Sequence, residues 1–321
     1  MGFPRPRVVV SACLGFAACR YDGSLIPNHV VEALGRYVEF IPVCPEMEIG
    51  LGTPRPPVRL VQEKGTVRLM QPDTGKDLTE AMQRFARAFL DRLPPVDGFL
   101  LKNRSPSCAV KDATVYTADG MRGPGLRAGL FAEAVLERFG DLPVEDEGRL
   151  TNRSIREHFF TAIFAFAALR EILEEGGMRE LVAFHTRYKL LLMAYNPRRL
   201  GELGRIVANP ERAPLETVRA RYAAAFRAAL RHPPRRPTVV NALLHAFGYF
   251  SDRLSRAEKA HFLEIVAAYR ARRLPLSTPL ALLRSWTVRF DEPYLRQQAF
   301  LLPFPEELIS LEDSGRGEGW V

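Results

Sequence analysis

The spacing of hydrophobic residues differs between the two halves of the chain. In the first half, short apolar runs alternate with stretches of helical periodicity. Buried strands are expected at Val8–Val10, Val38–Val43 and Gly98–Leu101, and a hairpin at Val58–Val61 and Thr66–Met70. Helices are expected at 28–37, 78–93 and 125–139. Strands that alternate with helices indicate an α/β domain with a doubly wound, mostly parallel sheet.

Beyond residue 148 the pattern is almost wholly helical. The segment Asp141–Gly148 separates the two patterns, because it is acidic, contains proline and has no periodicity. Helices are expected at Ser154–Glu175, Arg179–Tyr195, Leu215–Arg231, Val239–Arg253, Arg256–Arg273 and Ala281–Phe290. We therefore expect two domains, an α/β domain over residues 1–148 and an all-α helical domain over residues 149–321, each long enough to bury its own core.

Composition is typical of a globular protein that stays in the cytoplasm. The chain is 47% hydrophobic and 26% charged. Its apolar runs are too short or too interrupted by charge to span a bilayer, and Val8–Val10 is too short for the core of a signal peptide. Four cysteines in 321 residues do not make a disulfide scaffold. They are expected to be metal ligands, catalytic thiols or buried residues.

The formal net charge of +8 comes from the second half of the chain. Residues 1–150 carry 19 Lys and Arg against 19 Asp and Glu, whereas residues 151–321 carry 26 against 18. Between Arg179 and Arg236 the count is 13 basic against 4 acidic residues. A neutral half joined to a basic half suggests chemistry in one and a polyanion bound by the other. The alternative is that the arginines are solvated faces of ordinary helices.

Three cysteines follow three of the predicted strands. Cys13 comes shortly after Val8–Val10, Cys44 directly follows Val43, and Cys108 lies in the polar segment after Leu101. In a doubly wound sheet, the carboxyl ends of parallel strands line the crevice where ligands bind. Cysteines placed just past such ends can converge there although they are far apart in the sequence.

A trio of thiolates suits zinc or an iron–sulfur cluster. A structural zinc site takes four ligands that commonly come in close cysteine pairs, and this chain has no Cys-x-x-Cys pair. Three ligands leave one position open, which a catalytic metal requires. The alternative is three free, buried cysteines that act as small hydrophobic residues.

The motifs around these cysteines resemble those of the thiouracil desulfidase (TudS-like) family. They are Ser11-Ala-Cys-Leu-Gly15 with Cys19-Arg-Tyr-Asp-Gly23, Cys44-Pro-Glu46, Gly50-Leu-Gly-Thr-Pro-Arg55 and Lys102-Asn-Arg-Ser-Pro-Ser-Cys108. The second half resembles the helical YbgA-like domain through Phe184-His-Thr-Arg-Tyr-Lys-Leu-Leu-Leu-Met-Ala194, Asn241-Ala-Leu-Leu-His245 and Gly248-Tyr-Phe250. The combination is similar to the two-domain, RudS-type desulfidases that act on 4-thiouridine in tRNA.

The resemblance implies a 4Fe–4S cluster held by Cys13, Cys44 and Cys108, with one iron open for the sulfur of the substrate. Cys19 is then a non-ligand neighbour or a packing residue. The implied reaction is not a redox reaction: water replaces sulfur at a carbon of the base, which gives uridine in tRNA and releases hydrosulfide. No membrane and no obligate protein partner are implied.

Four further residues are candidates for that reaction. Glu46 lies two residues after a proposed ligand and is a candidate base for the water. Ser105 or Ser107 would orient the water or the base edge, and Lys102 would donate to developing negative charge. The alternatives are a helix N-terminal carboxylate for Glu46 and a surface cation for Lys102. Arg20 and Arg55 would neutralise the cluster or contact a phosphate, unless their segments serve only as turns.

The basic half offers candidates for contact with RNA. They are Arg187, Lys189, Arg198, Arg199, Arg235 and Arg236. Tyrosines between them would stack on exposed bases, or else belong to the core of a helix bundle. His245, in an apolar stretch, is expected in the core. Two other functions stay open: a desulfidase of free thiouracil or thionucleosides, and a non-enzymatic nucleic-acid-binding or redox-sensing protein.

Overall fold

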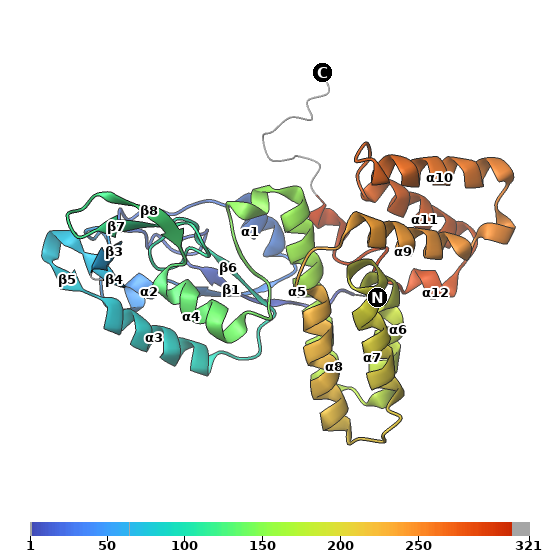
Figure 1. Ribbon diagram of the computed structural model, residues 1–321, viewed down its shortest axis with the longest axis horizontal. Coiled ribbons are helices and arrows are strands. Elements are labelled where there is room, and N and C mark those ends of the chain that lie inside the picture. The colour runs from blue at the N-terminus through green and yellow to red at the C-terminus, as the bar shows by residue number, and fades with distance from the viewer. Residues whose placement is uncertain (1, 64, 310–321) are drawn as a thin grey trace. The chain divides into compact units, whose positions relative to one another are not determined.

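A computed structural model describes residues 2–63 and 65–309 (Figure 1). The chain forms two compact units that divide between Ala167 and Ala168, inside helix α5 (Arg153–Glu175). The first is the N-terminal α/β unit, which also takes in the described residues after Glu306, and the second is helical. The α/β and all-α classes expected for the two halves are both confirmed. The expected boundary at residue 148 lies just before α5.

A parallel sheet of four strands forms the centre of the α/β unit. Its order is β2 (Glu39–Val43), β1 (Arg7–Ser11), β6 (Gly98–Leu101) and β9 (Val144–Asp146). All three pairings are parallel, with Ser11 opposite Val43 and Val10 opposite Leu100. The carboxyl ends of β1, β2 and β6 are therefore level, so the loops that follow them leave the sheet at the same edge.

A second sheet of five strands was only partly expected. Its order is β5 (Lys76–Asp77), β4 (Thr66–Gln71), β3 (Arg59–Glu63), β7 (Ala113–Thr117) and β8 (Arg122–Arg127). The antiparallel hairpin of β3 and β4 confirms the one predicted, and only β3 and β7 pair in parallel. The helix expected from residue 125 is wrong at its start, because these residues belong to β8 and helix α4 (Leu130–Phe139) begins later.

Helices cover both faces of the parallel sheet. Val9, Phe99 and Leu101 face a core shared with α3 (Thr79–Arg92) and α4, which includes Met82 and Phe131. Successive strand residues point to opposite faces. On the other face Gly98 approaches α5 so closely that a Cβ there would lie 2.9 Å from Cγ2 of Ile163. This arrangement matches the doubly wound sheet that was expected, and Figure 1 shows α3 and α4 side by side.

Two short helices also belong to the α/β unit. They are α1 (His29–Leu34), whose first turn is capped by the Asn28 side chain, and α2 (Pro45–Glu48), which begins immediately after Cys44. Asn28 accepts a hydrogen bond from the Val31 backbone N–H at 3.0 Å. Proline suits the first position of a helix, because the N–H that it lacks would have no partner there. Pro45 takes that position in α2, so Cys44 lies at the turn between β2 and the helix.

The helical unit contains the predicted helices and two that were missed. Its elements after α5 are α6 (Met178–Tyr195), α7 (Pro197–Ala208), α8 (Leu215–Leu230), α9 (Arg236–Gly248), α10 (Arg256–Arg270), α11 (Ser277–Arg289) and α12 (Pro293–Arg296). The missed helices are α7 and the short α12. Tyr188 stacks on Phe184 with ring centroids 4.4 Å apart and is 3% exposed, so it belongs to the core. In the described part of the chain, no helix combines the length and the apolar character that crossing a membrane requires.

Candidate active site

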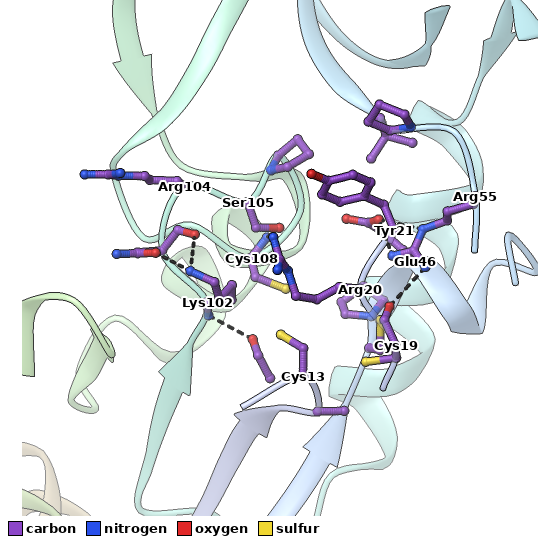
Figure 2. A pocket seen from close by; sticks show the side chains of 18 of the residues that line it. Cys13, Cys19, Arg20, Tyr21, Glu46, Arg55, Lys102, Arg104, Ser105 and Cys108 are labelled. Carbon is purple, nitrogen blue, oxygen red and sulfur yellow. Dashed lines mark hydrogen bonds and ion pairs between the residues drawn. The ribbon is translucent and has the colours of Figure 1, made fainter. Parts of the chain in front are cut away.

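A cavity of about 620 Å³ opens at the carboxyl edge of the parallel sheet (Figure 2). The loops after β1, β2 and β6 form one wall of this cavity. Arg59 of β3 and Thr114 and Tyr116 of β7, in the second sheet, form another. The parallel pairing thus places the ends of three strands against a surface made by a different sheet. This is the position that the sequence predicts for a ligand site.

All four cysteines line this cavity. Cys13 lies in the turn after β1, Cys44 between β2 and α2, and Cys108 in the turn after β6, while Cys19 follows Cys13 in the same loop. All four are free thiols. Cys108 and Cys19 are buried, and Cys13 and Cys44 are half-buried. The structure therefore brings the three cysteines singled out from the sequence to one cavity, and it adds Cys19.

The four thiols also influence each other. Burial raises the pKa of Cys13 to about 11, and the neighbouring Cys44 contributes to the rise. Burial raises the pKa of Cys19 to about 12, again with Cys44 close by. The pKa of Cys108 is raised well above its ordinary value by burial, against the effect of a hydrogen bond with Ser11. The thiols of Cys13, Cys19 and Cys108 are thus neutral near pH 7, and a metal would have to displace the proton of any of them that it binds.

The thiols that line the cavity are donors of the kind that hold an iron–sulfur cluster. Among residues 2–63 and 65–309, no group of three or more His, Cys, Asp or Glu side chains could hold one metal ion. A cubane cluster does not need such convergence, because each ligand thiolate binds a different iron atom. Free thiols spread around one cavity are consistent with that arrangement.

Glu46 is the carboxylate of the site, and it is held from two sides. One oxygen, Oε2, accepts hydrogen bonds from Arg55 Nε at 3.0 Å and Nη2 at 2.6 Å. The other, Oε1, accepts one from the Ser107 hydroxyl at 2.9 Å. Glu46 lines the cavity and is 9% exposed, whereas Ser107 is fully buried and lies outside the lining. Ser107 therefore contacts Glu46 rather than the cavity, and Oε1 keeps a lone pair for another donor.

Arg55 fixes more than its carboxylate partner. Its Nη1 donates to the backbone carbonyls of Cys19 at 3.0 Å and Gly52 at 2.8 Å. The side chain is 4% exposed, so all these contacts are made away from water. The sequence left Arg55 either as a turn residue or as a cation for the cluster or a phosphate. The structure shows that it binds Glu46 and joins the Cys19 loop to the segment after α2.

Lys102 lines the cavity but also belongs to a network with a residue that sequence reasoning missed. Its Nζ donates to Glu147 Oε1 at 2.5 Å and to the backbone carbonyl and side-chain oxygen of Asn103. Glu147 Oε2 accepts the Asn103 N–H at 2.8 Å. Both partners of the Lys102–Glu147 ion pair are largely buried. Glu147 was missed in the sequence because it lies in the acidic segment that was interpreted as the boundary between the two domains.

Ser105 shapes the loop that carries Cys108. Its Oγ accepts the N–H of Cys108 at 3.0 Å and of Ser107 at 3.2 Å, and Ser105 lines the cavity. Because the backbone uses Ser105 as an acceptor, its hydroxyl proton is available to donate into the cavity. Ser11, at the end of β1, accepts the Lys102 N–H at 2.9 Å and so ties the first strand end to the third.

The first residues of helix α4 bind the loop that carries Cys108. The backbone N–H groups of Phe131 and Ala132 donate to the Ser107 carbonyl, and that of Leu130 donates to Pro106. Gly129, which precedes the helix, packs against the same loop, and a Cβ there would lie 2.4 Å from the Ser107 carbonyl carbon. Only glycine allows this approach, because the atoms that would collide belong to the backbone.

The mouth of the cavity is basic and aromatic. Arg20, Tyr21, Arg59, Arg104 and Tyr116 all belong to its lining. The guanidinium of Arg59 lies 4.8 Å from the ring centroid of Tyr116, and that of Arg20 lies 5.5 Å from the ring centroid of Tyr21. Arg20 also forms an ion pair with Asp22 at 3.3 Å. Among the described residues no such ion pair is found for Arg59 or Arg104, so their positive charges are less compensated.

The residues predicted to contact RNA lie in different surroundings in the helical unit. Lys189, Arg198 and Arg235 are exposed and Arg187 is half-buried. Arg199 pairs with Glu202 at 2.6 Å, and Arg236 donates to the Tyr269 carbonyl at 2.8 Å. His245, expected in the core, is instead exposed. It follows buried Leu243 by two residues in α9, and on a helix that spacing moves a side chain to another face.

Comparison with known proteins separates the chain into the same two parts. Residues 8–147 match a family model described as 2-thiouracil desulfurase, and residues 189–305 match one described as a protein of unknown function (DUF1722).

Two curated proteins match the chain, one over each half. The uncharacterized protein YbgA of Escherichia coli strain K12 is 28% identical over 155 residues, which are 48% of this chain and 91% of that protein. The uncharacterized protein YbbK of Bacillus subtilis strain 168 is 28% identical over 138 residues, 40% of this chain and 90% of that protein. A solved structure of a [4Fe-4S]-dependent thiouracil desulfidase, TudS, is 31% identical, covers 46% of this chain and 93% of its own, and has a TM-score of 0.36.

The Glu46–Arg55 ion pair yields a prediction about stability. Replacing Arg55 by Met leaves the Glu46 carboxylate buried without a cation and is expected to lower the free energy of unfolding by roughly 3–5 kcal/mol. Adding Glu46→Gln to that variant removes the unpaired charge and is expected to restore part of the loss. Urea unfolding of the metal-free protein measures both changes.

A matched control is available on the surface. Arg84 and Glu80 also approach to 2.6 Å, but both side chains are mostly exposed. Arg84→Met is expected to change the free energy of unfolding by less than about 1 kcal/mol. An equally small effect of Arg55→Met would show that the buried pair does not hold this part of the site together.

The contact between Gly129 and the Cys108 loop gives a second prediction. Gly129→Ala forces the backbone of Pro106 and Ser107 to move, so we expect a loss of roughly 1–3 kcal/mol in the free energy of unfolding. Gly125→Ala is the control, since a Cβ there meets no atom within 4 Å. Thermal unfolding of both variants checks this, and equal midpoints would contradict the close approach.

Proposed function

We propose that this chain, which belongs over residues 8–147 to the 2-thiouracil desulfurase family, is an iron–sulfur-dependent desulfidase that converts 4-thiouridine in tRNA to uridine and hydrosulfide. One observation carries the proposal. Cys13, Cys44 and Cys108, which come from three separate strand ends, line one cavity together with the buried carboxylate of Glu46. Three thiols beside a carboxylate that can accept a proton suit a reaction in which water removes sulfur from a nucleobase.

The cofactor proposed for this cavity is a 4Fe–4S cluster held by Cys13, Cys44 and Cys108. When bound, it would supply a thiophilic iron with an open position, which acts as a Lewis acid toward the C=S group. Cys19 is proposed as a neighbour and not as a ligand. Its backbone carbonyl accepts hydrogen bonds from Arg55 and, at 3.8 Å, from the Cys44 thiol. Cys19 therefore positions Arg55, whereas its contact with Cys44 lasts only while that thiol keeps its proton.

Glu46 is proposed as the base that takes the proton of the attacking water. Arg55 and Ser107 hold its carboxylate in place, and Oε1 has a lone pair left for the water. The water adds its oxygen to the ring carbon and one of its protons goes to Glu46. The second proton ends on the sulfur, and the C–S bond breaks as hydrosulfide leaves and the carbonyl forms. A C–S bond is exchanged for a C–O bond, so the step needs no oxidant or reductant.

Two other residues would orient the substrate. Ser105 has a hydroxyl proton available on the cavity side and would direct the water or an edge of the base. Lys102 would donate to a carbonyl oxygen of the uracil ring where negative charge develops. Its three N–H groups donate to Glu147 and Asn103 in this structure, so the contact with the substrate would replace one of those to Asn103, while the ion pair with Glu147 keeps the ammonium group in place. Ser107, which was a candidate for direct contact, is proposed instead to act through Glu46.

The cavity mouth favours a nucleotide over a free base. A free thiouracil offers no phosphate to the guanidinium groups of Arg59 and Arg104, whereas a thiouridine within RNA carries a phosphate on each side. Tyr21 and Tyr116 offer aromatic faces for a neighbouring base. Such a thiouridine has to leave its stack to reach the cysteines, at a cost of a few kcal/mol, which phosphate contacts elsewhere on the protein offset.

An assay with two substrates tests the choice of substrate. The protein is purified and loaded with iron and sulfide under anaerobic conditions, and release of sulfide is followed with thiolated tRNA and with free 2-thiouracil. We expect turnover of the tRNA at a higher kcat/KM than that of the free base. Turnover of free 2-thiouracil without any turnover of tRNA would remove the proposed substrate and leave a desulfidase of free bases.

Cysteine variants test the cofactor. Cys13→Ala, Cys44→Ala and Cys108→Ala are each expected to abolish turnover and to lower the iron and sulfide retained after loading. Cys19→Ala is the matched control, because the same cavity loses a thiol that is not a ligand, and it is expected to keep its iron. A colourless protein that binds zinc in place of iron would contradict the proposal and favour a regulatory or purely RNA-binding protein.

A further inference from the structure

We propose that one end of the helical unit, here named the basic end, binds the phosphate backbone of RNA. It consists of Arg198, Arg231, Arg235, Arg270, Arg272 and Arg273. Of these six, only Arg198 and Arg235 are among the RNA-contact candidates named from the sequence. The inference deepens the proposed function and rests on it, since it assigns a surface to the RNA substrate.

Packing brings these arginines together from separate helices. Arg236, at the start of α9, donates to the Tyr269 carbonyl at 2.8 Å, and its guanidinium lies 5.0 Å from the centroid of the Tyr269 ring near the end of α10. The start of α9 therefore lies against the end of α10, as Figure 1 shows within this unit. Arg235 immediately precedes this contact, and Arg270, Arg272 and Arg273 immediately follow it.

A second contact adds the start of α7 to the same end. The Thr238 hydroxyl, in the first turn of α9, donates to the Ala194 carbonyl at 2.6 Å, near the end of α6. Arg198 follows in the first turn of α7, and Arg231 ends α8 just before the loop that leads to α9. The start of α7, the end of α8, the start of α9 and the end of α10 thus lie at one end of the helical unit, and each contributes at least one of the six arginines.

The charge of the basic end is not compensated by neighbouring acids. The six arginines are exposed, and no ion pair is found for them among the described residues. The sequence has no Asp or Glu between residues 217 and 251 or between 265 and 290. The other end of α9 and α10 differs, because Arg253, Arg289 and Arg296 there pair with Glu292, Glu258 and Asp291.

Phosphate is the ligand chemistry that fits such a surface. Guanidinium groups match the geometry of phosphate oxygens and stay charged at any physiological pH. The six side chains of the basic end are all arginines, so their contacts with phosphates would position RNA without reading sequence. Recognition of the thiolated base is then left to the cavity of the α/β unit. A polynucleotide backbone presents the repeated phosphates that several arginines need.

The test compares two triple variants of the full chain. Arg270→Gln, Arg272→Gln and Arg273→Gln together remove half of the basic end. Arg253→Gln, Arg289→Gln and Arg296→Gln remove the same number of charges from the paired arginines at the other end. Binding of fluorescently labelled tRNA is measured over a range of salt concentrations, without turnover, so the result does not depend on desulfidation. Circular dichroism and thermal unfolding confirm that both variants are folded.

The basic-end variant is expected to bind tRNA roughly 10- to 50-fold more weakly at about 0.15 M salt, with a salt slope smaller in magnitude by about 2. The control variant is expected to stay within about threefold of the unmodified chain. Equal losses in both variants would mean that binding follows net charge alone, and no loss in the first would place RNA elsewhere. Either result overturns the inference, while sulfide release from thiolated tRNA by the unmodified chain decides the proposed function separately.

Discussion

Parallel pairing of β1 with both β2 and β6 is the constraint on which the rest of the α/β unit depends. Because Ser11 lies opposite Val43 and Val10 opposite Leu100, three strand ends are level at one edge of the sheet. Residues that are far apart in the sequence, Cys13, Cys44 and Cys108, therefore reach the same cavity. A shift in the register of either pairing would move a cysteine along the strand direction by about 3.3 Å per residue.

Polar contacts at this edge then hold the loops in place. Ser11 joins the first strand end to the third through the N–H of Lys102, and Glu147 holds both Lys102 and Asn103. Arg55 and Ser107 fix Glu46 from opposite sides. Buried ion pairs of this kind contribute little net stability, because desolvation offsets their attraction, but they define one geometry. The charged residues of the site thus fix its geometry. The desolvation free energy that their burial costs is offset by the surrounding apolar core.

The sequence predicted much of this arrangement and missed particular parts for physical reasons. The strands before the cysteines could be recognised because short β-branched runs end in loops with glycine or proline. Strand β9 and Glu147 could not, because a strand of three residues lies within an acidic segment that resembles a linker. Helix α7 was missed because Asn196-Pro197 was taken as an end, although Asn196 caps that helix and proline suits its first position. The contact between Arg55 and Glu46 depends on loop geometry that no periodicity reveals.

The two units divide the proposed work according to their charges. The α/β unit has buried thiols, a fixed carboxylate and a cavity proposed to hold a base, whereas the basic end of the helical unit has arginines for which the described residues offer no ion pair. Contacts to phosphate are tolerant of sequence, and a cavity selects by shape and chemistry. The proposed substrate, a modified base within a polynucleotide, would use both, which would account for a neutral half and a basic half in one chain.

Mössbauer spectroscopy of the protein loaded anaerobically with iron-57 and sulfide tests the central claim most directly, namely that three cysteines hold a cluster with one open iron. Three irons with thiolate-like parameters and one that differs are expected, and the distinct iron should change when a thiolated substrate is added. Four equivalent irons, which would make Cys19 a ligand, or the absence of any cluster signal would contradict the claim.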